Sequence, residues 1–290
     1  MRIEGDEAIR RMESFPGVSK AGSVMAELVV MERLRPGVVS LTLSRPERRN
    51  ALNIEMLRQL MKQMESLEQD WDKGAGARVV VLLGAGPIFC AGMDLAEATQ
   101  PGLVAESASC IAGALRALRY SPLVTIAAVH GGAYAGGGGL VAACDMAVGT
   151  SDVLIGFPEA RRGLLPALIS QVMKSKVREG DLRELFLVGN PIDAQRAYQI
   201  GLLQRIAEPS NLLQEALQLA EGVLAGGPET IVATKRLLEH LYEPQSQADG
   251  EVDASAIDEH LKGRNSPEAV EGLRAFLEKR PPAWMRETGR

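Results

Sequence analysis

Four consecutive glycines and one later glutamate have the residue types and spacing for proton transfer beside a developing negative charge. Gly136 to Gly139 follow an apolar segment, residues 123–129, and precede a helical stretch that begins at Leu140. Each glycine disfavours a helix by about 1 kcal/mol relative to alanine, so four glycines at the start of a helix require a structural or functional explanation. Backbone N–H groups that face an anion at a helix N-terminus are one reason. Tight helix packing and a flexible loop are the alternatives.

The glutamate is Glu159, twenty residues after Gly139, in the segment F-P-E-A-R-R-G-L-L-P. A carboxyl between its apolar neighbours, Phe157 and the G-L-L-P segment, would have a raised pKa suited to proton delivery if it is buried, and the sequence does not give its exposure. A glutamate in the first turn of a helix, after Pro158, is the structural alternative.

The elements that must position these residues are predicted from the apolar pattern. Residues 24–34 and 37–43, separated by R-P-G, indicate an antiparallel hairpin. A helix is expected at 54–72 with Asn53 as N-cap, and strand 78–83 reads as buried on both faces. The following alternation of strands and helices indicates parallel β-α-β units. It comprises helix 104–119 and strands 123–129, 146–149 and 153–156.

After Pro166 the strands are predicted to stop. Helices are expected at 167–175, 179–188, 193–200, 210–225, 228–241, 252–262 and 267–279.

Two loops follow the carboxyl ends of predicted parallel strands, where sites of α/β proteins lie. One is F-C-A-G-M-D-L after strand 78–83, and the other is the glycine run after strand 123–129. Each offers an N–H group next to a glycine, and two convergent N–H donors are the minimum for an oxyanion hole.

Composition excludes several classes of protein. With 290 residues, 46% of them hydrophobic, the chain has enough material for a large core. A net charge of −5 with scattered basic residues argues against nucleic-acid or membrane partners. The three cysteines Cys90, Cys110 and Cys144 lie in apolar stretches without zinc-type spacing, which predicts buried thiols, no metal site and a cytoplasmic location. No secretory signal or membrane-spanning run is found.

Five blocks together resemble the enoyl-CoA hydratase/isomerase (crotonase) superfamily, from about Val24 to Trp284. In order, the blocks are S-R-P-E-R-R-N-A-L, F-C-A-G-M-D-L, the glycine run ending in A-A-C-D, F-P-E-A-R-R-G-L-L-P, and S-P-E-A-V-E-G-L-R-A-F-L-E-K-R. The resemblance implies an α/β fold, a stack of β-β-α turns, with a C-terminal helical region that trimerises, often as a dimer of trimers. It divides the chain into an extension (1–23), a core with the active site (24–210) and the helical region (211–290).

The resemblance also implies roles for particular residues. Met93 and Gly136 correspond to the backbone donors of the oxyanion hole, and Glu159 to a catalytic glutamate. Asp94 is expected to be a structural cap. Contacts to the acyl-CoA are implied for Arg49, Ala51, Ala91, Asp94, Leu95, Gly137, Gly139, Phe276 and Lys279. A solvated turn is the alternative for Arg48 and Arg49, and a core aromatic with a surface lysine for Phe276 and Lys279.

The sequence departs from the family pattern at Gly139, where well-known hydratases carry a second glutamate. Relatives with a small residue there, including bacterial 3-methylglutaconyl-CoA hydratases, resemble this chain through G-G-G-G-L and L-L-P-A. In this reading a substrate carboxylate or an ordered water fills the space at Gly139. Arg161 or Arg162 is a candidate partner for a distal substrate carboxylate, and Glu97 is a candidate second carboxylate.

The function predicted is therefore hydration or dehydration of an acyl-CoA or acyl-carrier-protein thioester, with 3-methylglutaconyl-CoA as a candidate substrate. No cofactor is expected beyond the coenzyme A of the substrate. An isomerase or decarboxylase with the same oxyanion hole is the alternative enzyme. A non-catalytic paralogue that binds acyl-CoA or RNA is the alternative of another class.

Overall fold

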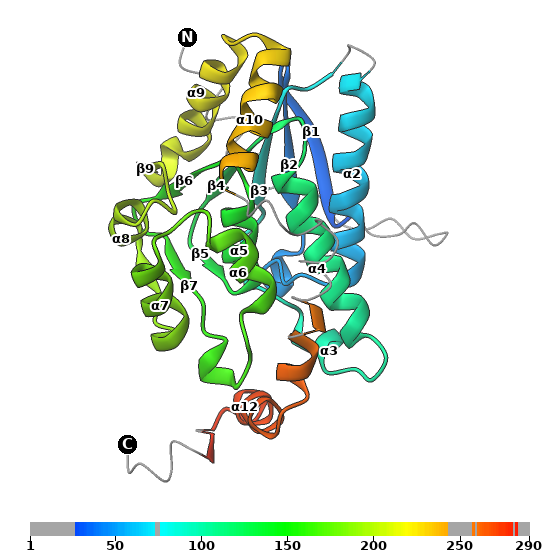
Figure 1. The fold of residues 1–290 in the computed structure, drawn as a ribbon, viewed down its shortest axis with the longest axis vertical. Coiled ribbons are helices and arrows are strands. Elements are labelled where there is room, and N and C mark those ends of the chain that lie inside the picture. Colours follow the sequence, from blue (N-terminus) through cyan, green and yellow to red (C-terminus); the bar gives the residue numbers. More distant parts are fainter. Residues whose placement is uncertain (1–26, 73–75, 243–256, 259, 281, 284–290) are drawn as a thin grey trace.

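A computed structural model of the chain describes residues 27–72, 76–242, 257–258, 260–280 and 282–283 (Figure 1). Strands β1 (Val29–Arg35) and β2 (Val38–Leu43) form the predicted antiparallel hairpin, in which Val29 lies opposite Leu43. The first strand begins five residues later than expected, and the extension at 1–23 lies outside the described residues.

One six-stranded sheet carries the fold, in the order β1-β2-β3-β4-β6-β9. Its further strands are β3 (Val79–Gly84), β4 (Val124–Val129), β6 (Met146–Thr150) and β9 (Arg205–Ala207). From β2 onward all neighbours are parallel. Every residue of β3 and β4 is buried, as their continuous apolar runs predict.

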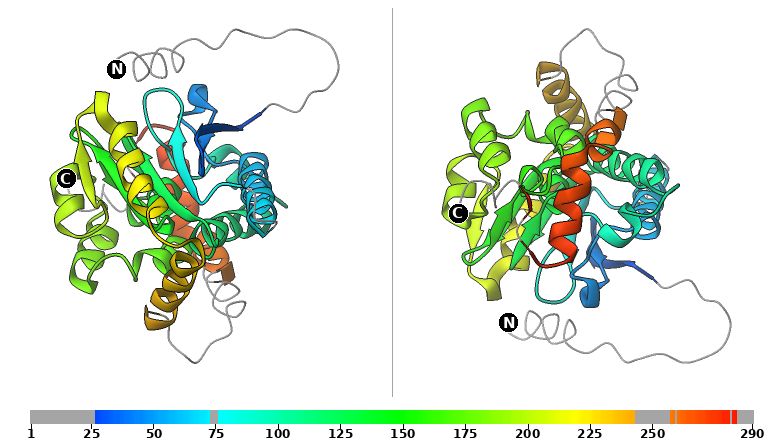
Figure 2. Two further views of the ribbon diagram at one scale, coloured as in Figure 1. Left: turned by 90° about the horizontal axis from the view of Figure 1, so that it is seen from above. Right: turned by 90° about the horizontal axis from the view of Figure 1, so that it is seen from below.

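Helices cover both faces of this sheet (Figures 1 and 2). Helices α2 (Ile54–Asp72) and α4 (Val104–Arg119) pack on the face that presents Val80 and Leu82. Helix α9 (Leu212–Leu224) packs on the opposite face, which presents Val79 and Val81. Alternate residues of one strand thus belong to two separate apolar clusters, because successive side chains point to opposite faces.

A second, three-stranded sheet stands beside the main one, in the order β5-β7-β8. It consists of β5 (Gly132–Tyr134), β7 (Leu154–Gly156) and β8 (Ile192–Asp193). Strands β8 and β9 both follow Pro166, so the prediction that strands stop there is wrong. Strands of two and three residues are too short to show alternation in sequence, and only their pairing to β7 and β6 defines them.

Most helices predicted for the C-terminal half are confirmed within a few residues. They are α6 (Ala167–Met173), α7 (Glu179–Val188), α8 (Ala194–Gln199), α9, α10 (Pro228–Tyr242) and α12 (Pro267–Leu277). Of the helix expected at 252–262, only residues 257–258 and 260–264 are described as helical. Seen from below, α12 crosses one end of the molecule (Figure 2).

The glycine run lies inside helix α5 (Gly136–Ala143), so this helix begins four residues before the expected Leu140. All eight residues of α5 are buried. A Cβ on Gly137 would lie 2.6 Å from the carbonyl oxygen of Cys90, and one on Gly138 2.7 Å from the ring of Phe157. Close packing therefore overrides the poor helix propensity of glycine, and the packing alternative is correct for these two positions.

Candidate active site

The two predicted loops lie side by side because their backbones pair. Cys90 N donates to the carbonyl of Gly132 at 3.1 Å, and Tyr134 N donates to the carbonyl of Cys90 at 2.9 Å. Gly92 has a φ of +93°, and a Cβ there would lie 2.7 Å from the carbonyl oxygen of Tyr134. The approach of the loops therefore requires glycine at this position.

Met93 and Gly136 present their N–H groups from these loops. Leu52 N donates to Gly92 O at 2.8 Å and Leu52 O accepts from Asp94 N at 2.9 Å, so Leu52 bonds the residues on either side of Met93. In a parallel pair, the residue between the two bonded ones directs its own N–H to the opposite side of its strand. The N–H of Met93 therefore points away from Leu52. Gly136 is the first residue of α5 and has no intrahelical acceptor. Its Cβ position would lie 3.9 Å from Met93 N, so the donors are neighbours.

Ala135, between Tyr134 and Gly136, is strained. Its φ of 50° and ψ of −119° suit glycine better than an L-residue. Two backbone bonds hold the conformation: Ala135 N donates to Gly156 O at 2.8 Å, and Ala135 O accepts from Gly139 N at 3.0 Å. The strain therefore lies at the residue that aims the N-terminus of α5.

A cavity of about 440 Å³ opens beside these donors. Nine of the residues predicted for the site lie in its wall: Arg49, Ala51, Ala91, Met93, Asp94, Leu95, Gly136, Glu159 and Phe276. Asp94 is also the predicted cap, accepting from Ala96 N at 3.0 Å, and it pairs with Arg45 at 2.6 Å. Gly137, Gly139 and Lys279 do not line the cavity.

The wall also contains residues that the sequence did not single out. They include Ile111 from α4, Leu168 and Ile169 from α6, and His260. The three apolar residues occupy the buried faces of their helices, a pattern indistinguishable from ordinary core positions. The sequence placed His260 on a surface-type helix, and this is wrong, because His260 is 8% exposed and lines the cavity.

Glu159 is the buried carboxyl of the cavity. The residue is 9% exposed, and its Oε2 has no hydrogen-bond partner in the part of the chain that the structure describes. Burial raises the pKa of Glu159 to about 7, and the positive charge of Arg162 offsets only part of this shift. A short 3-10 helix, Ala160–Arg162, begins after it, but the Glu159 side chain makes no capping bond to that helix. Glu159 therefore stands at the N-terminus of a short helix after Pro158, as the structural alternative has it, but its side chain does not cap that helix.

No open space exists at Gly139. A Cβ on this residue would lie 2.6 Å from Cγ2 of Ile169, which is 3% exposed. The expectation that a substrate carboxylate or water fills this position is therefore wrong, because the Ile169 side chain already does so. Glu97 does not supply a second carboxylate to the cavity either. It accepts from Ile54 N at 2.8 Å, at the start of α2.

The arginines predicted near the substrate separate into two groups. Arg161 donates to the carbonyl of Val188 at 2.9 Å and to Asn190, and it does not line the cavity. Arg162 lines the cavity and lies over the ring of Phe276 at 4.4 Å. Phe276 is 47% exposed, so the core-aromatic alternative is wrong. Arg48 and Arg49 are exposed at the cavity mouth.

The three cysteines are buried and free, as predicted. Burial raises the pKa of Cys90 and of Cys144 to about 12, so both remain protonated thiols at neutral pH. Within the described ranges, no group of three or more His, Cys, Asp or Glu side chains could hold a metal ion. In the same ranges, no helix has the length and apolar character needed to cross a membrane.

Comparisons with known proteins agree on one family. The family model described as Enoyl-CoA hydratase/isomerase matches residues 33–287. Enoyl-CoA hydratase EchA19 of Mycobacterium tuberculosis is 34% identical over 247 residues, which cover 83% of this chain and 90% of that protein. Mevalonyl-coenzyme A hydratase sidH of Aspergillus fumigatus is 30% identical over 260 residues, 86% of this chain and 92% of that protein.

A solved structure shares the fold. The crystal structure of an enoyl-CoA hydratase from Mycobacterium avium superposes with a TM-score of 0.75 at 34% identity, and the match covers 90% of this chain and all of that one.

Proposed function

Because this chain belongs to the enoyl-CoA hydratase/isomerase family, we propose that it is an acyl-CoA hydratase/dehydratase with Glu159 as its single proton carrier. The mixed α/β crotonase fold with a helical C-terminal region, predicted from the sequence, is confirmed. One observation carries the proposal: a buried carboxyl with a pKa of about 7, whose Oε2 has no hydrogen-bond partner among the described residues, shares a cavity with two adjacent backbone donors.

The backbone donors would act on the thioester carbonyl. In our proposal this oxygen lies between the N–H groups of Met93 and Gly136. When water adds to the β-carbon of an α,β-unsaturated thioester, electrons move onto the carbonyl oxygen and form an enolate. Fixed donors bind the enolate more strongly than the neutral carbonyl, so they lower the barrier. Because both act through the backbone, the methionine side chain does not interfere.

Glu159 would carry the proton in both halves of the reaction. Its carboxylate accepts a proton from water as the water oxygen bonds to the β-carbon, and the same proton then passes to the α-carbon as the enolate collapses. In dehydration, the carboxylate takes the α-proton and returns it to the departing hydroxide. A pKa of about 7 suits both transfers, because neither protonation state is strongly favoured at neutral pH.

The remaining family features are part of the same proposal. The exposed Arg48 and Arg49, with Ala51, would bind the coenzyme A portion of the substrate at the cavity mouth. The ring of the half-exposed Phe276 would also contact the bound coenzyme A. The acyl carrier is coenzyme A or an acyl carrier protein, 3-methylglutaconyl-CoA is one candidate substrate, and no further cofactor takes part. A homotrimer or dimer of trimers, a cytoplasmic location and the domain division at residues 23 and 210 stay predictions.

Double-bond isomerisation is the second candidate, favoured by the packing at Gly139. Since Ile169 fills that position, no second carboxyl stands there to hold water together with Glu159, as the pair in a two-glutamate hydratase would. Moving one proton from the γ-carbon to the α-carbon needs only one carrier and no bound water.

Incubation with enoyl-CoAs in oxygen-18 water separates these functions. We expect crotonyl-CoA or 3-methylglutaconyl-CoA to gain one labelled water, seen by product mass, and Glu159→Gln to slow this reaction about 100-fold or more. A product of unchanged mass in ordinary water, which gains one deuterium at the α-carbon when the reaction is run in deuterated water, would support the isomerase. Thioester binding without turnover would indicate the non-catalytic paralogue and contradict the proposal.

A further inference from the structure

A short 3-10 turn places a cation on the same side of the backbone as Glu159. Arg162 ends the 3-10 helix Ala160–Arg162, and its N–H donates to the carbonyl of Glu159 at 2.8 Å. In a 3-10 helix, the side chains of residues i and i+3 lie above one another. Glu159 and Arg162 both line the cavity, which agrees with this geometry. The guanidinium group therefore lies on the side of the turn that carries the carboxyl group.

Helix α12 holds Arg162 in this place. The Phe276 ring lies against the guanidinium group, with 4.4 Å between the ring centre and Cζ, and the face of an aromatic ring attracts a cation. A Cβ on Gly272 would lie 2.3 Å from the carbonyl oxygen of Arg162, so α12 approaches this backbone as closely as only glycine permits. Leu273 of the same helix is buried in one cluster with Leu164. The backbone and the side chain of Arg162 are thus both fixed by α12.

The charge of Arg162 is not neutralised by direct contact with a carboxylate. Among the described residues, its side chain forms no ion pair or hydrogen bond, and it packs on the Phe276 ring. The neighbouring Arg161 differs, because it donates to Val188 O and to Asn190 Oδ1 and does not line the cavity. Arg162 is only half-buried, and water screens a charge in this position only in part.

The other charged groups of the cavity wall are screened, paired or neutral. Three of them are exposed at the mouth, where water screens their charges: Glu47, Arg48 and Arg49. Asp94 is paired with Arg45 at 2.6 Å. Burial lowers the pKa of His260 to about 4, so its imidazole is neutral at pH 7. Arg162 is therefore the charged residue of the wall that acts on Glu159.

We propose that Arg162, held by helix α12, is a positioning residue that keeps part of the Glu159 population ionised and so ready to accept a proton from water. The catalytic consequence of this inference rests on the proposed function. Burial favours the neutral carboxyl, whereas the residue's own N–H group and the cation of Arg162 favour the carboxylate. These opposing effects leave the pKa of Glu159 at about 7.

A direct ion pair would give a different result. An arginine in contact with a carboxylate lowers its pKa by about 1 to 3, which makes the carboxylate a weaker base. The Phe276 ring instead covers one face of the guanidinium group and holds it near Glu159 without pairing. In this arrangement both protonation states of Glu159 are populated near neutral pH, as general acid–base catalysis requires.

The pH profile of kcat/KM for crotonyl-CoA tests the inference, because its midpoint reports the pKa of Glu159 in the free enzyme. Arg162→Met removes the charge and keeps a long side chain, so its midpoint should lie about one pH unit above that of the wild type. Arg162→Lys keeps the charge and should have a midpoint close to that of the wild type. Arg161→Met is the matched control, and its midpoint should equal the wild-type value.

Phe276→Leu tests the part played by α12. This variant removes the ring that holds the guanidinium group, so its midpoint should rise in the same direction as in Arg162→Met but by a smaller amount. When Arg162→Met is already present, Phe276→Leu should add no further rise, because the two side chains act as one unit.

Urea unfolding measures the same interaction without turnover. In Arg162→Met the folded protein should retain the Glu159 proton to a higher pH, so its stability should continue to fall at pH values where that of the wild type is already constant. Glu159→Gln, added to Arg162→Met, should remove this additional fall. A purely structural role of Arg162 would lower stability equally at every pH.

Two results would overturn the inference. One is a wild-type pH dependence of unfolding in Arg162→Met, with an unchanged midpoint of kcat/KM. The other is a loss of kcat/KM by the same factor at every pH, which would assign Arg162 to direct contact with the substrate. If the wild type turned over no enoyl-CoA, the proposed function would fail, and the unfolding measurement alone would support or overturn the action of Arg162 on Glu159.

Discussion

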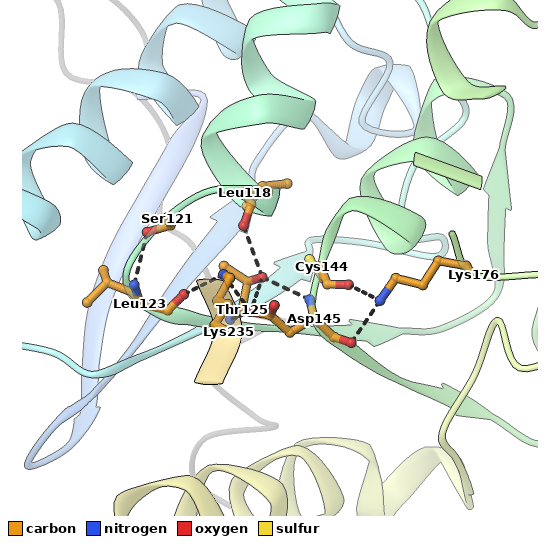
Figure 3. A network of polar contacts seen from close by, with 8 residues as sticks. All are labelled: Leu118, Ser121, Leu123, Thr125, Cys144, Asp145, Lys176 and Lys235. Carbon is orange, nitrogen blue, oxygen red and sulfur yellow. Dashed lines mark hydrogen bonds and ion pairs between the residues drawn. The ribbon is translucent and has the colours of Figure 1, made fainter. Parts of the chain in front are cut away.

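Two regions of the molecule bury charged side chains in opposite ways. In the first, shown in Figure 3, Lys235 of α10 is 8% exposed and donates to Leu123 O at 2.9 Å and to Asp145 Oδ2 at 2.8 Å. The same Asp145 oxygen accepts from Thr125 N at 2.7 Å. Lys176 donates to the carbonyls of Cys144 and Asp145 at 2.7 and 2.8 Å.

The cavity region instead contains a buried carboxyl without such a partner. Among the described residues, Glu159 Oε2 has no hydrogen-bond partner, and Ala135 in the same cavity wall has a strained backbone. The first region therefore fastens β4, β6 and α10 together, whereas the second holds polar groups that only a ligand would satisfy. The difference indicates which buried charges serve stability and which serve binding.

Breaking the paired region should cause the largest loss of stability. Asp145→Ala leaves the Lys235 ammonium without its carboxylate and removes the acceptor of Thr125 N, so we expect unfolding free energy to fall by about 3 to 5 kcal/mol. Urea denaturation measures this change. The folded variant should keep its KM for enoyl-CoA, and a raised KM with unchanged stability would contradict the division into two regions.

Removing the carboxyl of Glu159 should raise stability above pH 7, whereas Asp145→Ala lowers it. The folded pKa of Glu159, about 7, exceeds its ordinary value of 4.5, so between those pH values the folded protein retains a proton that the unfolded chain has lost. Stability therefore falls as pH rises through this window, by about 3 kcal/mol in total. Glu159→Gln should remove this fall and be the more stable protein at pH 8. Urea titrations at pH 5 and 8 measure both effects, and identical pH dependence in the two proteins would refute the assigned pKa shift.

The packing at Gly139 should give a smaller effect. Its added Cβ would overlap Ile169, so Gly139→Ala is expected to cost about 2 kcal/mol through overpacking. Ile169→Ala removes the colliding methyl group, and in the double variant the Gly139→Ala cost should largely disappear. Additive losses in this double-mutant cycle would show that Gly139 has free space after all.

The strain at Ala135 should give the smallest effect. Ala135→Gly relieves the positive φ but adds freedom to the unfolded chain, so we expect a net gain of about 1 kcal/mol in unfolding free energy. Ala233→Gly, the same change at an exposed position within α10, is the backbone-entropy control and should instead lose stability. If Ala135→Gly also lost stability, the conformation of Ala135 would not be strained.

The long elements and the two loops could be predicted from the sequence because their signals are local. The buried runs of β3 and β4 and the spacing of α2 each identify themselves, and Asn53 Oδ1 accepts from Met56 N as an N-cap should. Strands β8 and β9 could not be predicted, because only pairing with β7 and β6 defines them.

At the candidate site, residue types were predictable and surroundings were not. The convergence of Met93 and Gly136 follows from parallel topology, whereas the burial of Glu159 is known only from the structure. The filling of the Gly139 position by Ile169, thirty residues later, depends on how α5 and α6 pack.

The pH dependence of hydration tests the central role of Glu159 most directly. The measurement is kcat/KM for crotonyl-CoA from pH 5 to 9, for the wild type and for Glu159→Gln, with protein folding checked at each pH. Since the carboxylate begins both directions of the reaction, wild-type kcat/KM should rise with pH to a plateau, with a midpoint near the pKa of about 7. The variant should be at least about 100-fold slower and lack this midpoint. A wild-type rate that falls through pH 7, or a variant that hydrates as fast as the wild type, would contradict the account.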